Sequence, residues 1–394
     1  MEKKSFYGVD TDGFLGVLKK KGHGASIAVT NGDSVETCCS GSGRFGRNFP
    51  VEPDMLFQAG SVSKPVFAAT LLRYADKGSI DLDADISSVI SDFVDFPLTF
   101  AALLSHTAGF NVHGFPGYRA RHRLLSLEDV LAGRGNTHRV RRTQPYGEQF
   151  SYSGGGITLA ELAFTRITGI TLQDAFAQEV AAPLGLTRSG FFQPLDEDRI
   201  KSAAFGGQLG IWEDRAHGYH YYPEHAAAGL WTTPTELTRI GVALSRSFRE
   251  GGFLSGKAAV RMMTPIRNDY GLCLGCRKDA AGHNGSNMGF LTFWKFSKLM
   301  GIVYLEDKFT TQRLTLIAEP FSFHSIQGKQ FIVTINTISR HHKSIQELTD
   351  LPLLLGRPIE QILASITFSQ LPELVYWIFG GIDNILEGSI FDTR

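Results

Sequence analysis

The sequence predicts an α+β fold, in which strands from both ends of one region form a sheet and a helical segment is inserted between them. Apolar and polar residues alternate between turns over residues 24–60, and this strand-like pattern returns over residues 268–306. Between them, residues 81–190 show mainly helical spacing. The order of strands, helices and strands favours a sheet assembled from both ends of the region.

Turn and capping residues mark the first strands and the helix that follows them. Asn31-Gly32 separates two alternating apolar runs, which predicts a hairpin. A helix with one apolar face is expected after Ser61, and Gly78 should end it. Pro65 falls in the first turn of this helix, where its missing N–H costs little.

The inserted segment contains two further clear helices. The stretches TLAELAFTRITG (158–169) and TLQDAFAQEVAAPLGL (171–186) combine helical spacing, an early threonine and a Gly or Pro stop. Residues 226–246 predict a small-residue loop and another helix, and we expect loops over 105–118 and 133–151.

The composition is that of a globular protein without a charge bias. Of the 394 residues, 43% are hydrophobic and 20% are charged, which excludes wholesale disorder. Lys and Arg together number 39, as do Asp and Glu, so no net charge attracts nucleic acid. The arginines within residues 119–142 lack interleaved aromatic residues and are interpreted as a solvated face. We therefore expect no nucleic-acid partner, and the sequence leaves the oligomeric state open.

Neither a metal nor a cofactor is expected. Cys273-x-x-Cys276 has no second ligand pair nearby, and YGLCLGC alternates like a strand, so we interpret both thiols as packed within strands. The glycine-rich stretch GSGRFG (41–46) is not followed by a helical pattern, which argues against a dinucleotide site. In GGFLSGKAA (251–259), Ala258 replaces the Ser or Thr that would bind magnesium in a phosphate-binding loop.

The sequence also predicts where the protein resides. The N-terminal stretch MEKKSFYGVDTDGF lacks an apolar core, so no signal peptide is expected and a cytoplasmic protein is predicted. A periplasmic or secreted protein would require a leader that has been removed. The apolar stretch LVYWIFGGI is too short to span a bilayer, so no integral membrane segment is expected.

Ser61 and Lys64 form the first candidate catalytic pair. They stand three residues apart on the predicted helix, so their side chains share one face. A serine hydroxyl becomes a good nucleophile when a base takes its proton, and a neighbouring lysine can either act as that base or hold another base in its active form. At a helix N-terminus, the backbone N–H of Ser61 also points toward a developing oxyanion.

Two further stretches contain candidate partners. Tyr152 lies in FSYSGGG before an expected glycine turn, and a cation such as Lys64 would lower its pKa so that it acts as a base. His283 lies in GHNGSNMGF, whose glycines let a substrate approach the backbone. Ser286 in the same stretch could supply a second N–H to the oxyanion.

Together these three elements resemble the active site of the penicillin-recognising serine hydrolases. The elements are SxxK at 61–64, Tyr-Ser-x at 152–154 and His-x-Gly at 283–285, and the resemblance is strongest to the class C β-lactamase-like branch with its D-peptidases and carboxylesterases. The supporting stretches are LLSHTAGF (103–110), PYGEQFSYSGGG (145–156) and AAAGLWTTPTELTRI (226–240).

The resemblance implies an antiparallel sheet flanked by helices, with an inserted all-α subdomain above the cleft. It covers residues 20–306 as a catalytic domain, with its sheet region at 20–80 and 220–306 and its helical insertion at 81–215. Residues 308–394 change in character and form a C-terminal segment without an assigned role.

The resemblance also implies a role for each candidate residue. Ser61 would be the acylated nucleophile, and Lys64 would help to deprotonate it and keep Tyr152 anionic or strongly hydrogen-bonded. Tyr152 would carry the proton to the leaving group and then activate the hydrolytic water. His283 stands where many relatives have lysine, and would bind a substrate carboxylate or support the tyrosine. The list of expected substrate-binding or oxyanion residues is Ser286, Gly285, Ser153 and Gly154.

These residues predict a serine hydrolase that forms an acyl-enzyme on a small ester or a short D-amino-acid peptide. Gly154 replaces the asparagine that β-lactamases of this branch use to hold the substrate amide, which favours esters or peptides over β-lactams. A D,D-carboxypeptidase and a true β-lactamase stay as alternatives. A non-catalytic descendant that binds peptidoglycan or a protein is the alternative of another class.

Overall fold

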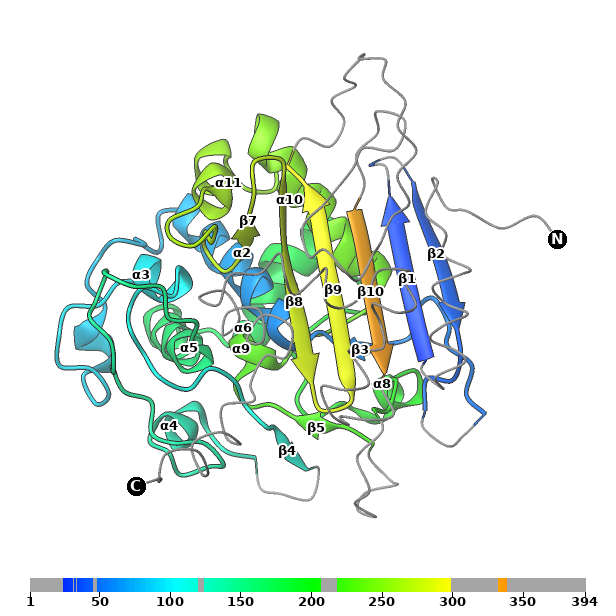
Figure 1. Cartoon of the computed structure of the whole chain (residues 1–394), viewed down its shortest axis with the longest axis horizontal. Helices are drawn as coiled ribbons and strands as arrows, with labels where there is room; N and C mark the ends of the chain where they lie inside the picture. The colour runs from blue at the N-terminus through cyan, green and yellow to red at the C-terminus, as the bar shows by residue number, and fades with distance from the viewer. Residues whose placement is uncertain are drawn as a thin grey trace, which may run out of the picture. The chain divides into compact units, whose positions relative to one another are not determined.

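The main sheet contains six strands in the part of the chain that the structure describes. The structure is a computed structural model that describes residues 24–30, 32, 34–44, 48–119, 124–206, 218–298 and 332–338. All of these belong to one compact unit, Met1–Phe309 with Ser325–His341. The strand order is β2-β1-β10-β9-β8-β7, and every neighbouring pair is antiparallel (Figure 1). The strands are β1 (Gly24–Thr30), β2 (Val35–Ser40), β7 (Gly275–Cys276), β8 (Ala280–Asn287), β9 (Phe290–Ser297) and β10 (Ile332–Ile338).

The predicted α+β class is confirmed, and so is the first hairpin. Strands β1 and β2 pair from Ala25 with Ser40 to Thr30 with Val35, on either side of the predicted turn. Every residue of β1 is buried, in keeping with its small and branched side chains and its position between two other strands.

A strand from beyond residue 306 lies inside this sheet. Strand β10 pairs with β1 on one side and with β9 on the other. Its residue Ile338 therefore lies between Gly24 of β1 and Phe290 of β9. The stretch LMGIVYLED (299–307), also expected to be strand-like, and the short helices expected near the C-terminus lie outside the described residues.

In the described part of the chain the helices cover one face of the sheet: Trp294 and Phe296 of β9 are buried in the helical core, whereas Phe293, which points to the other face, is exposed. Helix α10 packs against β1, β9 and β10 and is seen behind the strands in Figure 1. The helical elements before it are η1 (Gly60–Val62), α2 (Ser63–Asp76), η2 (Ser87–Ile90), α3 (Phe100–Leu104), α4 (Leu127–Leu131), α5 (Gly154–Thr168), α6 (Leu172–Phe176), the π-helical segment η3 (Ala177–Ala181), α7 (Ala182–Leu184), α8 (Glu197–Lys201) and α9 (His225–Ala228). The last two are α10 (Pro234–Glu250) and α11 (Gly256–Met263).

Two short strand pairs lie outside the main sheet. Strand β3 (Phe57–Gln58) pairs with β6 (Trp231–Thr232), immediately before η1. Strand β4 (Tyr118–Arg119) pairs with β5 (His220–Tyr221) and so joins the inserted segment to the chain that leaves it.

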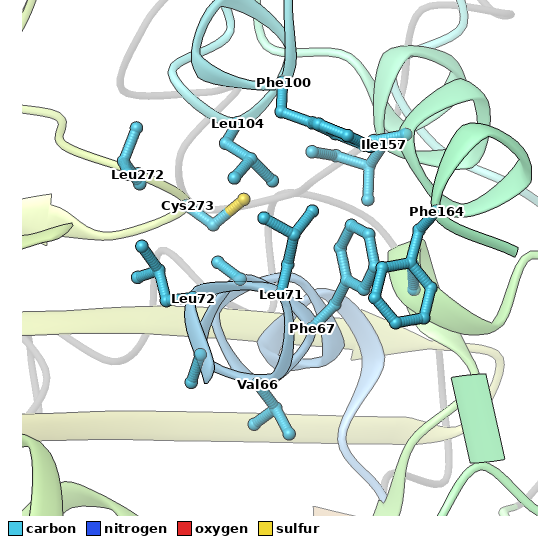
Figure 2. Close-up of a cluster of buried hydrophobic side chains, with 14 of the residues drawn as sticks. Val66, Phe67, Leu71, Leu72, Phe100, Leu104, Ile157, Phe164, Leu272 and Cys273 are labelled. Atoms are coloured by element: carbon cyan, nitrogen blue, oxygen red, sulfur yellow. The ribbon is translucent and has the colours of Figure 1, made fainter. Parts of the chain in front are cut away.

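Helix α2 is the central helix of the core. Nearly all of its residues are buried, and it ends before Gly78, which has the positive φ of 74° that the predicted stop requires. Figure 2 shows its Phe67 and Leu71 beside side chains of α3 and α5, with Cys273 on another side. The ring of Phe67 meets that of Phe164 edge-on, with centroids 6.0 Å apart. The helix is therefore held on several sides, which fixes the position of its first turn.

Sequence patterns located the helices of the insertion but misplaced the start of one of them. Helix α5 begins at Gly154, four residues before the expected threonine, because Ser153 caps it by accepting a hydrogen bond from the Gly156 N–H. The three glycines after Tyr152 are therefore the first turn of a helix and not a separate glycine turn. The next helical run begins with Thr171 as its cap, as expected.

The two cysteines of YGLCLGC are buried and free, but only one of them lies in a strand. Cys276 belongs to β7, whereas Cys273 has a φ of 57° and donates its N–H to the carbonyl of Leu104. The strand interpretation of Cys273 is therefore wrong, because a left-handed turn replaces the alternating backbone at this point. Among the described residues, no group of His, Cys, Asp and Glu side chains is arranged to hold a metal ion. None of the described helices has the length and apolar character needed to cross a bilayer.

Candidate active site

Ser61 lies in the short helical turn η1, directly before α2. The turn depends on Gly60, whose φ of 53° lies in the left-handed region. Ser63 fastens the turn because its hydroxyl donates to the Gly60 carbonyl at 2.6 Å and accepts the Leu230 N–H at 2.9 Å. Ser61 is itself partly exposed, so its hydroxyl is accessible from the solvent side of a rigid turn.

Lys64 is buried one turn further on and contacts Ser61 directly. Its Nζ lies 3.0 Å from the Ser61 Oγ and donates to the Ala227 carbonyl at 2.8 Å. Only 2% of the residue is exposed, and this burial lowers the pKa of Lys64 to about 7. A large fraction of Lys64 is therefore uncharged near neutral pH, with a lone pair available to the serine hydroxyl.

Tyr152 approaches the same serine from the residue before the cap of α5. It forms a side-chain hydrogen bond with Ser61, and the Lys64 Nζ lies 5.0 Å from the centroid of its ring. Desolvation by burial nevertheless raises the pKa of Tyr152, and the bond to Ser61 offsets this only in part. The expectation that Lys64 lowers this pKa is therefore wrong: the hydroxyl keeps its proton in the resting enzyme because burial penalises the anion.

His283 faces Tyr152 from strand β8. Its Nε2 lies 3.5 Å from the Tyr152 hydroxyl and 2.9 Å from the hydroxyl of Tyr270, and its Nδ1 lies 2.5 Å from the Asn284 carbonyl. Burial, followed by the nearby charge of Lys64, lowers the pKa of His283 to about 3. His283 is consequently neutral at physiological pH.

Ser286 and Gly285 bring strand β8 against the turn that contains Ser61. A Cβ on Gly60 would lie 2.6 Å from the Ser286 nitrogen, and a Cβ on Gly285 would lie 1.9 Å from the Ala59 oxygen and 3.1 Å from the Ser61 nitrogen. Only glycine fits at either position, because the two backbones are in contact. The amides of Ser61 and Ser286 therefore lie close together, as an oxyanion site requires.

Asn287 and Gln58 fasten this contact. The Asn287 amide donates to the Gln58 Oε1 at 2.9 Å and to the Ala228 carbonyl at 3.0 Å, and all of these groups are buried. Sequence reasoning missed Asn287, Gln58 and Tyr270, because each acts through a partner outside its own stretch of sequence. Tyr270 could have been noticed as an aromatic residue within YGLCLGC, but nothing in that stretch relates it to His283.

Ser153 and Gly154 are enclosed by the loop that follows α3. The Ser153 hydroxyl donates to the Asn111 carbonyl at 2.7 Å and also caps α5, so both of its roles are structural. A Cβ on Gly154 would lie 2.8 Å from the Phe115 ring and 2.9 Å from the His113 carbonyl. The structure thus places both residues beside Tyr152, and Phe115 occupies the space that an asparagine side chain would need.

A partly exposed serine on a helical turn, a buried lysine 3.0 Å away, a tyrosine and two neighbouring backbone amides form the kind of arrangement found in serine hydrolases whose base is a lysine. The family model for Beta-lactamase matches residues 14–305 of this chain. The chain therefore belongs to the β-lactamase family, among the penicillin-recognising serine hydrolases.

Individual relatives agree with this assignment. Penicillin-binding protein 4 of Amycolatopsis lactamdurans is 28% identical over 213 residues, which cover 52% of this chain and 54% of the relative. Esterase EstB of Burkholderia gladioli is 26% identical over 279 residues, covering 64% and 68%. The chain thus spans about half the length of the first of these proteins and about two thirds of the second.

Solved structures share the fold. The D-amino acid amidase of Ochrobactrum anthropi complexed with D-phenylalanine superposes with a TM-score of 0.66 at 17% identity, covering 88% of this chain and 98% of the amidase. An octameric penicillin-binding protein homologue from Pyrococcus abyssi superposes with a TM-score of 0.60 at 20% identity, covering 89% and 79%. At these identities the likeness concerns the fold.

Proposed function

We propose that this protein is a serine hydrolase that forms an acyl-enzyme on small esters or short D-amino-acid peptides. The observation that carries the proposal is the 3.0 Å contact between the Lys64 Nζ and the Ser61 Oγ, within a buried setting that lowers the pKa of the lysine. A binding protein has no need for a base with a lowered pKa beside a partly exposed serine.

Acylation begins at the Ser61 hydroxyl. Neutral Lys64 accepts the hydroxyl proton while the oxygen attacks the acyl carbon, and the Ala227 carbonyl holds the amine in place. The carbonyl oxygen of the substrate becomes an oxyanion, which the N–H groups of Ser61 and Ser286 stabilise.

The leaving group departs with a proton from Tyr152. Because its pKa is raised, the Tyr152 hydroxyl holds a proton that it can donate as the bond to the leaving group breaks. The resulting tyrosinate then recovers a proton from the lysine ammonium, whose nitrogen lies over the face of the tyrosine ring. Water releases the acyl group by the reverse sequence, and the serine hydroxyl is restored.

The surroundings of Gly154 favour esters or peptides over β-lactams. The asparagine expected here in β-lactamases of this branch would meet Phe115 and the His113 carbonyl, so no side-chain amide holds a substrate amide at this position. The esterase among the relatives and the D-amino acid amidase among the solved structures support the same choice of substrate classes.

Hydrolysis of p-nitrophenyl butyrate by the wild type and by Ser61→Ala tests the proposal. We expect the variant to lose at least about a thousandfold in kcat/KM, since the nucleophile is gone. Its circular dichroism and unfolding midpoint should match the wild type, because Ser61 is partly exposed. Ser91→Ala, at an exposed serine in a different segment, is the matched control and should keep full activity.

A fluorophosphonate probe provides a second readout that does not depend on the choice of substrate. Mass spectrometry of the labelled wild type should locate the adduct on Ser61 and on no other serine. Folded wild-type protein that neither reacts with the probe nor hydrolyses the ester would exclude the enzyme and leave the binding descendant.

A further inference from the structure

The hydrogen bonds of His283 determine which of its nitrogens carries the proton. Its Nδ1 lies 2.5 Å from the Asn284 carbonyl, and a carbonyl oxygen only accepts. The proton of the neutral imidazole is therefore on Nδ1, and Nε2 presents a lone pair. Both hydroxyls near Nε2, those of Tyr270 and Tyr152, face this one acceptor.

Tyr270 is the nearer of the two donors. Its hydroxyl lies 2.9 Å from Nε2, whereas the Tyr152 hydroxyl lies at 3.5 Å and also bonds to Ser61. Tyr270 is almost fully buried, and its ring packs against the rings of His106 and Phe150. Tyr270 thus has little freedom to leave Nε2, and it stabilises the form of His283 in which this nitrogen accepts.

In the proposed mechanism, the leaving group of a substrate would lie next to this acceptor. The Tyr152 hydroxyl donates to the leaving group in the proposed mechanism, and His283 contacts that same hydroxyl. A carboxylate attached to the leaving group would find no N–H donor at His283, because Nε2 carries no proton and its lone pair accepts from Tyr270. A neutral group, or one that offers an N–H or O–H, does not need such a donor.

The neighbouring cations do not compensate for a neutral histidine. Within the described residues, Lys64 is the basic side chain whose charge lowers the pKa of His283. Its Nζ is already hydrogen-bonded to the Ser61 Oγ and the Ala227 carbonyl. Lys295 lies opposite Gly282, one residue before His283, and therefore on the other face of the sheet. The other titratable side chains that surround His283 are Tyr152, Tyr270 and His106.

We infer that Tyr270 is a positioning residue that holds His283 as a neutral hydrogen-bond acceptor, so that the site selects substrates whose leaving group carries no carboxylate. The inference rests on the proposed hydrolase function and narrows it. Neutral esters and amides fit the site, whereas peptides that release a free amino acid carboxylate do not. Of the two roles that the resemblance implied for His283, support of the tyrosine is retained and carboxylate binding is not.

Nitrogen-15 NMR of histidine-labelled protein tests the state of His283 without any substrate. The signals of His283 are identified by their loss in His283→Gln. We expect the neutral form with the proton on Nδ1, unchanged from pH 8 down to about pH 5. In Tyr270→Phe the donor to Nε2 is absent, so the pKa of His283 should rise measurably. Tyr146→Phe, which removes an exposed hydroxyl elsewhere, is the matched control and should leave the titration unchanged. A protonated His283 at pH 7, a proton on Nε2, or an unmoved titration in Tyr270→Phe would overturn the inference.

A matched pair of substrates tests the selectivity. The butyrate esters of 3-hydroxybenzamide and 3-hydroxybenzoate differ only in the charge carried by the leaving group. We expect the wild type to prefer the neutral ester by at least about tenfold in kcat/KM, and His283→Lys to narrow or reverse this ratio. In Tyr270→Phe the ratio should narrow as the pH is lowered, which a purely structural role would not produce.

The two hypotheses fail in different ways. Equal turnover of the two esters by the wild type overturns the selectivity but leaves the hydrolase in place. No turnover of either ester and no labelling of Ser61 overturn the hydrolase, while the NMR experiment still reports whether Tyr270 fixes the state of His283.

Discussion

The two sides of Ser61, the proposed nucleophile, are built in different ways. On one side, Lys64 in the first turn of α2 contacts Ser61 in η1, the helical turn directly before it. On the other side, Tyr152, Tyr270 and His283 come from three separate segments and meet only in the folded protein. The first side is therefore as rigid as one helix, whereas the second depends on how well the sheet, the insertion and the turn at residue 270 are packed together.

The largest effect is expected on the side of Ser61 that Lys64 forms, when the amine of this lysine is removed. We expect Lys64→Met to lower kcat/KM by about a thousandfold, because the serine loses its base. The variant should remain at least as stable as the wild type, since a buried amine is replaced by an apolar chain of similar length. Ester kinetics and urea unfolding check both statements.

Lys257→Met is the matched control, because this lysine is exposed on α11. It should retain wild-type kinetics. A Lys64→Met enzyme with unimpaired turnover would exclude lysine as the base and transfer that role to Tyr152.

The next largest effect is expected from a methyl group placed where strand β8 contacts η1. In Gly285→Ala the new Cβ would overlap the Ala59 oxygen, so β8 must move away from η1. We expect a loss of about 1–3 kcal/mol in the free energy of unfolding. We also expect kcat to fall more than KM changes, because the two oxyanion amides separate. Gly256→Ala, where a Cβ meets open space in α11, should leave kcat unchanged and should not lower the free energy of unfolding.

The smallest effect concerns pH and distinguishes the two sides by their titrating groups. If neutral Lys64 is the base, kcat/KM should rise about tenfold per pH unit below an apparent pKa near 7 and level off above it. His283, with a pKa of about 3, should contribute no step between pH 5 and 8.

The stability should depend on pH in the same region. Unfolded Lys64 binds a proton up to about pH 10.5, whereas folded Lys64 releases it near pH 7. Between these values the unfolded state binds more protons, so the free energy of unfolding should rise with pH. This part of the slope should be missing in Lys64→Met, and an identical slope in both proteins would contradict the lowered pKa.

The sequence was sufficient to predict the pair Ser61 and Lys64. On the other side of Ser61 it indicated Tyr152 and His283 but not Tyr270. Ser61 and Lys64 are three residues apart, so helical geometry alone brings them together. Tyr152 and His283 were found through a family resemblance, because no local rule places them near Ser61. Tyr270 escaped notice because a turn with positive φ at Asn268 and Asp269 directs the chain there, and single-sequence patterns do not report such turns.

The fold shows the same division between local and long-range information. The first hairpin and the helix after Ser61 were predicted correctly, since their turn and stop residues lie next to these elements in the sequence. Strand β10 went unrecognised, because what identifies it is its pairing with β1 and β9. The pKa of Tyr152 was predicted in the wrong direction, since a sequence shows a neighbouring cation but not the burial that outweighs it.

The position of β10 also has a consequence for the order of events during synthesis. A ribosome delivers β1 at the start of the chain and β9 much later, yet the two cannot be joined until residues 332–338 have emerged. Until then each strand has a free backbone edge that is able to pair with another nascent chain. The central step of folding is therefore late and non-local, which predicts slow refolding and a need for protection by chaperones while the chain is incomplete.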